Sequence, residues 1–523
     1  MQARRSTWIQ RLTFAGAIAA LAGCGSLPFS LPGAAVAPTR ADLAFAYEQF
    51  DRVFASLSFA PAELASVNQA FDQAAFSFFA GNYARTIREV NAVTARIACG
   101  SQSTDAARLA GSLCVRLDPP VWLSGASAAA TARVASMFDS GLAPGTELSI
   151  ELQLRRLDGS RAFAVPVSVV ISATGLVDQS LSLPSGDGAL PVGSYDVWLV
   201  AGGSCEFRFG RWFVVDRSLD ALRRSNASRL RAVRPSSNSL RHAVALCKQR
   251  NDLLRDASSS DNSAIFLADL PGLAADVEAE VAAIELGDNP YHRKTGDHWR
   301  RIGGFLSDLP FRVYAPTTAA GDEPLPLVVA LHGAGGDENM FFAGYGAGVL
   351  RRLAEEKGFI AVTPATFPVL TNTSLFDRLL EHLKVDYAID PTRVYVVGHS
   401  LGGGATVAVA QSRSPTVAAA CCIAGGRDFP VGLPVTRLYI GELDPIAPPR
   451  NLEAAALRAQ NAGVPIEYEI LVGYGHTLSV NAALPSAIDW LLERTASGGA
   501  ASARPRLPAA PRPSGSKLEE AAR

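Results

Sequence analysis

The spacing of hydrophobic positions changes several times along the chain, and each change predicts a different kind of structure. Between residues 41 and 98, large apolar side chains such as Phe50 and Phe71 recur at helical spacing, which predicts packed helices. From residue 147 apolar and other residues alternate between glycine-rich turns, which predicts four or five short strands in a small β-sandwich. Helical spacing returns over 217–286. We find no catalytic constellation in these regions.

After residue 300 the pattern becomes strand, helix, strand, helix. Continuous apolar runs predict strands that are buried on both faces. Six such runs occur, at 326–331, 358–362, 393–397, 417–423, 437–440 and 466–472. Helical segments separate most of them, so the order predicts an α/β domain with a mostly parallel sheet and helices on both faces.

The first residues have the pattern of an export signal. Arg4, Arg5 and Arg11 precede a short apolar stretch that is too brief to span a bilayer as a mature helix. The stretch ends in Leu-Ala-Gly-Cys, with the cysteine at position 24, which resembles the lipobox of bacterial lipoproteins. The resemblance implies cleavage before Cys24 and acylation at Cys24, because several acyl chains anchor a protein stably where one does not. An ordinary secretory signal is the alternative.

Together these patterns predict an order of regions along the chain. It comprises a lipoprotein signal peptide (1–23), a flexible tether (24–40), a helical region (41–146), a small β-sandwich module (147–216), a second helical region (217–286), an α/β catalytic domain (287–497) and a disordered tail (498–523). The expected location is the cell envelope, with a lipid anchor at Cys24. The glycine that follows Cys24 indicates the outer membrane by the sorting rule of lipoproteins, with the protein facing the periplasm or the surface.

Composition narrows the function further. Hydrophobic residues make up 48% of the 523 residues, which excludes wholesale disorder. Forty-eight basic residues stand against 49 acidic ones, and this balance argues against a nucleic-acid partner. Seven cysteines are too few and too scattered for a disulfide scaffold or a zinc module. Four of them could pair in an oxidising compartment or remain as buried thiols, namely Cys99, Cys114, Cys205 and Cys247.

A nucleophile candidate follows the third apolar run. The segment Gly398-His399-Ser400-Leu401-Gly402 matches G-x-S-x-G, and it lies between a buried strand and a helix of small residues. Such a strand, sharp turn and helix form a nucleophile elbow, which exposes the serine hydroxyl at the edge of the sheet. A serine hydroxyl is a weak nucleophile at neutral pH, so Ser400 needs a base and an anion-stabilising pocket.

Both requirements have candidates at the same sheet edge. The glycine-rich segment 331–336 follows the first apolar run, and its Ala334 N–H, together with the N–H of Leu401, can form an oxyanion hole. His476 and Asp444 each follow a later strand, which predicts a general base and the acid that orients it. Glu442 and Asp428 are alternatives for the acid.

These residues carry a family resemblance. The region 300–495 resembles the α/β-hydrolases, and within them the secreted esterases that are similar to polyhydroxybutyrate depolymerases and feruloyl esterases. It also resembles the catalytic domain of prolyl-oligopeptidase-like peptidases. The features that carry the resemblance are Leu331-His332-Gly333-Ala334-Gly335-Gly336, Gly398-His399-Ser400-Leu401-Gly402-Gly403, Gly441-Glu442-Leu443-Asp444 and Gly475-His476. It implies hydrolysis of a carboxylic ester through an acyl-serine intermediate, without a metal or an organic cofactor.

Three function classes follow from this resemblance and the N-terminal signal. The first is an envelope-anchored esterase or depolymerase that acts on a small-molecule or polymeric ester. The second is a serine peptidase or amidase with the same triad. The third is a lipid-anchored binding protein with a degenerate hydrolase domain. The intact Ser400, Asp444 and His476 argue against the third class. The β-rich module could bind a ligand that its sequence does not identify.

Overall fold

The computed structural model of the chain describes residues 35–99, 104–126, 129–183, 190–202, 205–255, 267–303 and 308–496. The predicted signal peptide, Cys24, most of the tether and the tail lie outside these ranges. Within them, no helix combines the length and the apolar composition that crossing a bilayer requires.

The C-terminal half is built on one eight-stranded sheet. Its strands lie in the order β16 (Ile466–Leu471), β15 (Val435–Gly441), β14 (Ala419–Ile423), β13 (Ile389–His399), β11 (Leu325–Leu331), β12 (Ile360–Pro364), β10 (Leu309–Ala315) and β9 (Gly296–Ile302). β10 is antiparallel to both of its neighbours, and the other neighbouring pairs are parallel. Each of the six predicted apolar runs coincides with or overlaps a parallel strand. The first five runs are largely buried, but the prediction of burial on both faces is wrong for 466–472, because β16 is the edge strand and most of its side chains are partly or fully exposed.

Helices cover the two faces of this sheet. One face carries α12 (Ser374–Lys384), α13 (Leu401–Ser412) and α14 (Pro449–Asn461), and the other carries α10 (Tyr345–Lys357) and α15 (Ser479–Leu492). Successive residues of β11 alternate between the two cores, with Val329 in one and Val328 and Ala330 in the other. The strand order and the two helical layers confirm the predicted α/β-hydrolase fold.

In the described part of residues 35–215, four helices combine with two sheets. The helices are α2 (Arg40–Ser56), α3 (Pro61–Phe79), α4 (Tyr83–Cys99) and α5 (Asp105–Ser112). One sheet has the order β1 (Leu113–Asp118), β3 (Thr131–Ser136) and β6 (Asp178–Ser182). The other has the order β2 (Val121–Leu123), β8 (Glu206–Val215), β7 (Gly193–Val200), β4 (Glu147–Arg156) and β5 (Arg161–Val170). One hydrophobic core joins these helices and sheets.

The predicted helical region 41–146 is therefore wrong from residue 113 onward, where β1, β2 and β3 begin the β-rich part. β1 and β3 pair antiparallel over six residues each, and their apolar side chains are buried except for Leu117, which is partly buried. β3 is short and includes Ala132 and Ala135, so its composition gives little strand signal. Its conformation depends on pairing with β1 and β6, which tertiary contacts provide and local sequence does not show.

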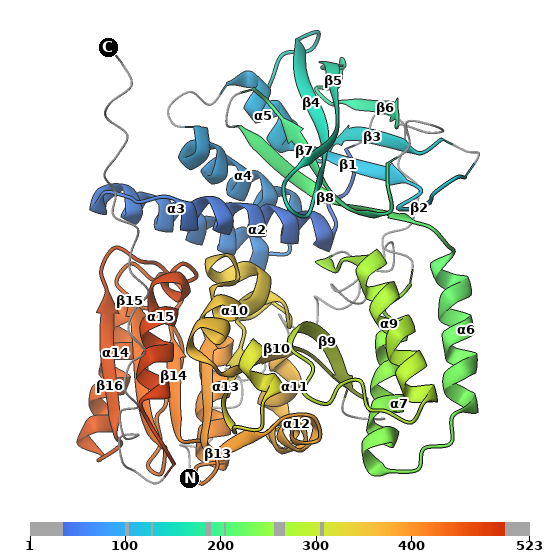
Figure 1. Ribbon diagram of the computed structural model, residues 1–523. Coiled ribbons are helices and arrows are strands. Elements are labelled where there is room, and N and C mark those ends of the chain that lie inside the picture. The colour runs from blue at the N-terminus through green and yellow to red at the C-terminus, as the bar shows by residue number, and fades with distance from the viewer. Residues whose placement is uncertain are drawn as a thin grey trace, which may run out of the picture.

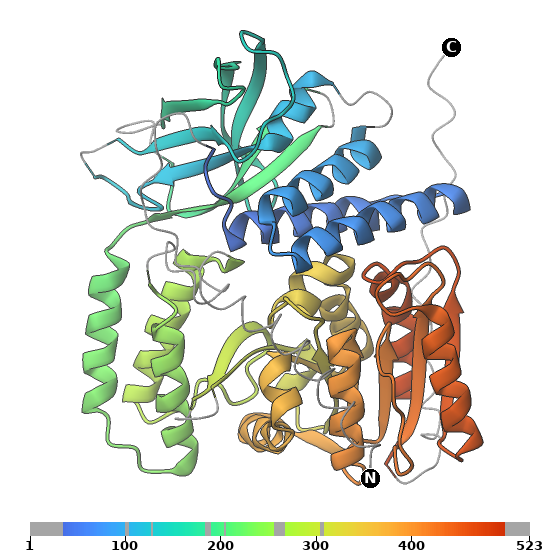
Figure 2. The same ribbon diagram turned by 180° about the vertical axis from the view of Figure 1, so that it is seen from behind.

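Two groups of helices lie next to the α/β domain. The second helical region contains α6 (Leu219–Ala232), α7 (Asn238–Asn251) and α9 (Leu270–Glu285), which have their own core and lie beside the sheet domain (Figure 1). α2 and α3 lie between the β-rich part and one end of the α/β domain, as the views from both sides show (Figures 1 and 2). The N-terminal helices therefore lie against the α/β domain.

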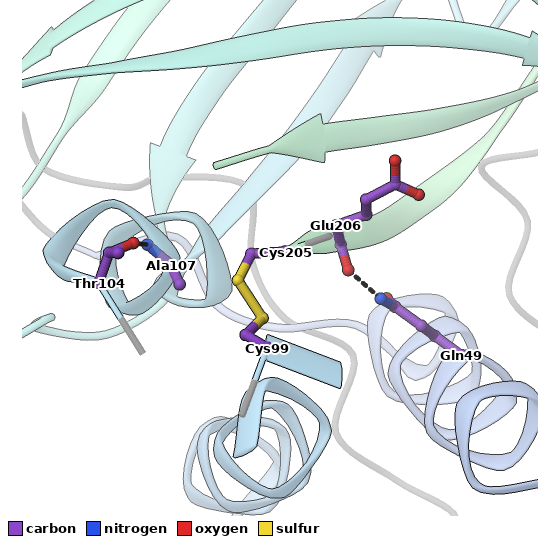
Figure 3. The surroundings of a disulfide bond; sticks show 6 residues. All are labelled: Gln49, Cys99, Thr104, Ala107, Cys205 and Glu206. Carbon is purple, nitrogen blue, oxygen red and sulfur yellow. Dashed lines mark hydrogen bonds between the residues drawn. A yellow bond between two sulfur atoms is a disulfide. The ribbon is translucent and has the colours of Figure 1, made fainter. Parts of the chain in front are cut away.

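Covalent and ionic contacts tie these helices to the β-rich part. Cys99 at the end of α4 forms a disulfide with Cys205, which precedes β8, and Gln49 of α2 donates a hydrogen bond to the carbonyl of Glu206 next to it (Figure 3). Of the four cysteines considered as possible partners, Cys114 and Cys247 are buried free thiols. The fully buried Arg208 pairs with Glu48 of α2 at 2.7 Å, which adds an ion pair to the same junction.

Candidate active site

Ser400 lies at the sharp turn between β13 and α13. Its backbone has φ 53° and ψ −114°, a conformation that costs a non-glycine residue about 1–3 kcal/mol. The glycines on either side make the turn possible. A Cβ on Gly402 would lie 1.8 Å from the carbonyl oxygen of Leu331, and one on Gly398 would lie 2.1 Å from the carbonyl oxygen of Gly402. The motif G-x-S-x-G is therefore required by the close backbone approach at this turn.

The structure brings the three predicted side chains together. The distance from His476 Nε2 to Ser400 Oγ is 2.9 Å, and the distance from His476 Nδ1 to Asp444 Oδ2 is 2.7 Å. With Nδ1–H donating to the carboxylate, Nε2 carries the lone pair and accepts the hydrogen bond from the serine hydroxyl. His476 and Asp444 are both 3% exposed, whereas Ser400 is half-buried and lines a cavity.

Asp444 is the carboxylate that contacts the imidazole. Its second oxygen accepts hydrogen bonds from the backbone N–H groups of Ile446 and Ala447, at 2.8 and 2.7 Å, so the carboxylate orientation is fixed. The two alternatives occupy other positions. Glu442 is exposed and accepts the N–H of Gly473, and Asp428 is exposed. Geometry thus favours Asp444 over both.

The predicted oxyanion-hole residues come from two segments, the loop after β11 and the start of α13. Ala334 lines the same cavity as Ser400. Leu401 is the first residue of α13, where backbone N–H groups have no acceptor within the helix. The positive end of the helix also favours a developing negative charge there. The arrangement can supply two N–H donors to an oxyanion.

Two buried histidines hold the surrounding loops. His332 Nε2 accepts the N–H of Thr366 at 3.0 Å, and its Nδ1–H donates to the carbonyl oxygen of Gly333 at 2.8 Å. His399 Nδ1 lies 2.7 Å from the Tyr345 hydroxyl, and its Nε2 lies 3.1 Å from the carbonyl oxygen of His476. Burial lowers the pKa of both imidazoles, which keeps them neutral in these roles.

The cavity beside Ser400 is mainly apolar and has a volume of ≈170 Å³. Its walls come from both halves of the chain. The catalytic domain contributes the segment 333–337 and residues of 339–345, and the N-terminal helices contribute Leu43, Ala44, Tyr47, Phe71, Ala74, Ala75, Phe78, Phe79 and Val90, among others. Arg40 and Asp337 form an ion pair among the lining residues. The contribution of the N-terminal helices was not foreseen from the sequence.

α3 also contacts the loop that carries His476. Asn68 Oδ1 accepts the N–H of Gly475 at 2.8 Å, and Asp72 Oδ2 accepts the N–H of His476 at 2.9 Å. Burial raises the pKa of Asp72 to about 6, and the N–H donated by His476 opposes this rise. No motif marks these residues. The only sequence signal is a polar pair four positions apart on the apolar helix, at Asn68 and Asp72.

The described residues contain no cluster of three or more histidine, cysteine, aspartate or glutamate side chains that could hold a metal ion. The remaining cysteines near the site, Cys421 and Cys422, are buried in β14, and burial raises the pKa of both thiols. Neither has the features of a reactive thiolate.

Comparisons with known proteins find similar esterases. No family model matches the chain. A bifunctional acetylxylan esterase/xylanase from Neocallimastix patriciarum is 30% identical over 138 residues, which are 25% of this chain and 20% of that protein. The chain thus aligns with about one fifth of the length of this relative.

Three solved structures illustrate the structural matches. The S-formylglutathione hydrolase of Staphylococcus aureus is 13% identical, with a TM-score of 0.33, and the match covers 38% of this chain and all of that chain. A thermostable esterase is 14% identical, with a TM-score of 0.35, over 69% of this chain and 95% of that chain. The feruloyl esterase module from Clostridium thermocellum is 15% identical, with a TM-score of 0.33, over 38% and 88%. The structural neighbours are thus esterase-type hydrolases by their names.

Proposed function

We propose that the protein is a serine hydrolase that cleaves carboxylic esters through an acyl-serine intermediate. The observation that carries the proposal is the continuous hydrogen-bonded chain from Ser400 Oγ through His476 to Asp444. A hydroxyl on a strained turn, an oriented imidazole and a buried carboxylate form the arrangement that acyl transfer requires.

In the first half of the reaction, Ser400 Oγ attacks the ester carbonyl carbon while His476 Nε2 takes the hydroxyl proton. The carbonyl oxygen becomes an oxyanion, which the N–H groups of Ala334 and Leu401 stabilise. Asp444 stabilises the imidazolium without taking its proton. When the C–O bond to the alcohol breaks, His476 donates its proton to the leaving oxygen, and the acyl group stays on Ser400.

In the second half, water replaces the alcohol. His476 removes a proton from the water as its oxygen attacks the acyl-serine carbon. The second tetrahedral intermediate collapses, the proton returns to Ser400 Oγ, and the carboxylic acid leaves. Loss of one oxyanion-hole donor costs about 3 kcal/mol of transition-state stabilisation in such reactions.

The cavity supports a substrate with an uncharged, apolar group next to the scissile ester. Its mostly apolar lining and volume of ≈170 Å³ suit a group about the size of a benzene ring, since an apolar cavity of about 150 Å³ can hold benzene. Small-molecule esters and ester groups that project from a polymer both meet this description.

We also propose that the chain is held at the cell envelope through Cys24, on the basis of the lipobox-like sequence that ends there. Incorporation of labelled palmitate into the wild type, but not into Cys24→Ser, tests this proposal.

The test of the catalytic proposal uses a fluorophosphonate probe and a substrate panel. We expect the purified wild type to react with the probe and to hydrolyse p-nitrophenyl esters. We expect Ser400→Ala to lose both activities, because the substitution removes the hydroxyl that forms the acyl intermediate. Full labelling of Ser400→Ala would exclude Ser400 as the nucleophile. The absence of any reaction in the wild type would instead support a binding protein.

Peptide p-nitroanilides complete the panel. We expect turnover of the esters to exceed that of the anilides. Faster cleavage of the anilides would assign the same triad to a peptidase or amidase.

A further inference from the structure

The backbone of the loop that carries His476 is held by a helix more than 400 positions away in sequence. The N–H of Gly475 donates to Asn68 Oδ1 and the N–H of His476 donates to Asp72 Oδ2, with separations of 407 and 404 residues. Asn68 and Asp72 lie one turn apart on α3, so both side chains project from the same face of the helix. Both are buried, with exposures of 0% and 2%.

The contact between helix and loop is unusually close. A Cβ on Gly475 would lie 2.0 Å from Asp72 Oδ2, which is less than any normal contact between a carbon and an oxygen. Only glycine at position 475 allows the carboxylate to reach the next amide. The hydrogen bond from the His476 N–H to Asp72 therefore requires glycine at position 475.

The catalytic domain fixes the same residue from the opposite side. The carbonyl oxygen of His476 accepts a hydrogen bond from Ser479 Oγ at 2.6 Å and lies 3.1 Å from His399 Nε2. The amide of His476 has its acceptor on α3 instead. Its backbone is thus held between two parts of the chain, with Asp72 as the acceptor on the N-terminal side.

The cost of burying the Asp72 carboxylate indicates that it serves to hold this amide. A buried carboxylate is costly unless hydrogen bonds or a cation compensate for the lost hydration. Among the described residues, no lysine or arginine forms an ion pair with Asp72, and the groups that donate to it are the amides of His476 and, at 3.5 Å, Thr477. A leucine here would avoid this cost but would leave the loop amide without an acceptor.

We propose that Asp72 and Asn68 are positioning residues for the general base, so that α3 is part of the active site. This inference rests on the proposed function. Neither side chain contacts the reacting atoms. They hold the backbone from which the imidazole extends, and a displacement of about 1 Å between reacting groups can cost about 100-fold in rate. The site is therefore incomplete without the N-terminal helices.

The experiment measures kcat and KM of the full chain on a p-nitrophenyl ester, together with the melting temperature. We expect Asp72→Ala to lower kcat by roughly 10- to 100-fold while KM changes less than about threefold, because substrate contacts are kept and the base is displaced. Asp72→Asn retains an oxygen that can accept the His476 N–H, so it should recover most of the lost kcat. Gln73→Ala is the matched control, since Gln73 is the exposed neighbour on the same helix.

Each outcome decides the proposal. A kcat for Asp72→Ala within twofold of the Gln73→Ala value overturns it, and so does an Asp72→Asn variant that is as slow as Asp72→Ala. If Asp72→Ala does not fold, Asn68→Ala takes its place, and a lower kcat at unchanged KM supports positioning whereas an unchanged kcat overturns it. Failure of the proposed function itself has a different signature, because the wild type would then not react with the fluorophosphonate probe.

Discussion

At the scale of single residues, the site combines strain and burial in a few positions. Ser400 has a positive φ, and Asp444 and His476 are almost fully buried. The surrounding structure has to compensate for these costs. The N-terminal helices add further costs of this kind, because Asp51 of α2 and Asp72 of α3 are buried carboxylates that contact the α/β domain.

The raised pKa of Asp51 leads to a prediction of how the stability of the protein depends on pH. It accepts a hydrogen bond from Asn481 Nδ2 of α15 at 2.8 Å, and burial raises its pKa from 3.8 to about 7. The neighbouring Glu48 also raises this pKa, and the hydrogen bond from Asn481 opposes the rise. The folded state then binds a proton more tightly than the unfolded state, so this group lowers stability as pH rises from about 4 to about 7.

We expect Asp51→Asn to remove part of that pH dependence. The neutral amide has no ionisation cost, and it can donate to Asn481 Oδ1, a buried atom without a hydrogen-bond partner in the described part of the chain. The measurement is the melting temperature at pH 5 and at pH 8. The melting temperature at pH 5 minus that at pH 8 should be smaller in Asp51→Asn than in the wild type. An equal difference in both proteins would show that Asp51 does not titrate in this range.

At the scale of elements, α3 forms a wall of the cavity. The ring of Phe78 lies close to the glycine-rich segment 331–336. A Cβ on Gly335 would be only 2.2 Å from this ring. Phe78 lines the cavity, and its neighbour Phe76 is 44% exposed on the same helix. The helix thus limits the size of the group that can bind beside Ser400.

Phe78→Ala should therefore allow longer acyl groups to bind beside Ser400. Each methylene group of the substrate that becomes buried stabilises the bound state by about 0.8 kcal/mol. If the smaller side chain lets two more methylenes be buried, kcat/KM for a longer ester should rise roughly tenfold relative to that for a short one. The measurement is the ratio of kcat/KM for p-nitrophenyl octanoate and p-nitrophenyl butyrate. Phe76→Ala should leave this ratio at the wild-type value. An equal ratio in Phe78→Ala and Phe76→Ala would show that Phe78 does not limit the length of the acyl group.

The elements also show how far the sequence could predict the structure. The parallel strands were predictable because burial on both faces gives continuous apolar runs, such as 393–397 in β13. The turn at Ser400 was predictable because close backbone contacts require Gly398 and Gly402. The role of α3 was not predictable, since Asp72 and His476 are 404 positions apart and no local pattern connects them. β3 was missed for a similar reason, because its pairing partners determine its conformation.

At the scale of the whole molecule, the Cys99–Cys205 disulfide closes a large loop. The two cysteines are 106 positions apart and join the end of α4 to the residue that precedes β8 (Figure 3). A crosslink over such a distance reduces the entropy of the unfolded chain and typically stabilises a protein by about 2–4 kcal/mol. It also fixes the helices that form the cavity wall against the β-rich part.

We expect the double substitution Cys99→Ser/Cys205→Ser to lower the free energy of unfolding by about 2–4 kcal/mol. Urea denaturation, followed by circular dichroism, measures this change, and a reductant should destabilise the wild type to a similar degree. The reductant should have no effect on the double variant, which serves as its control. A wild type with the same urea midpoint in the presence and absence of reductant would contradict the prediction.

The contact between Asp72 and His476 has a consequence for the order of biosynthesis. Translation produces α3 long before the loop that carries the imidazole, and N-terminal regions generally fold first as a chain emerges from the ribosome. The helix face that bears Asn68 and Asp72 is thus available as a template onto which the late-made loop docks. The acceptors for the amides of Gly475 and His476 therefore exist before those amides are synthesised, and we expect the imidazole to become ordered only when the loop reaches them.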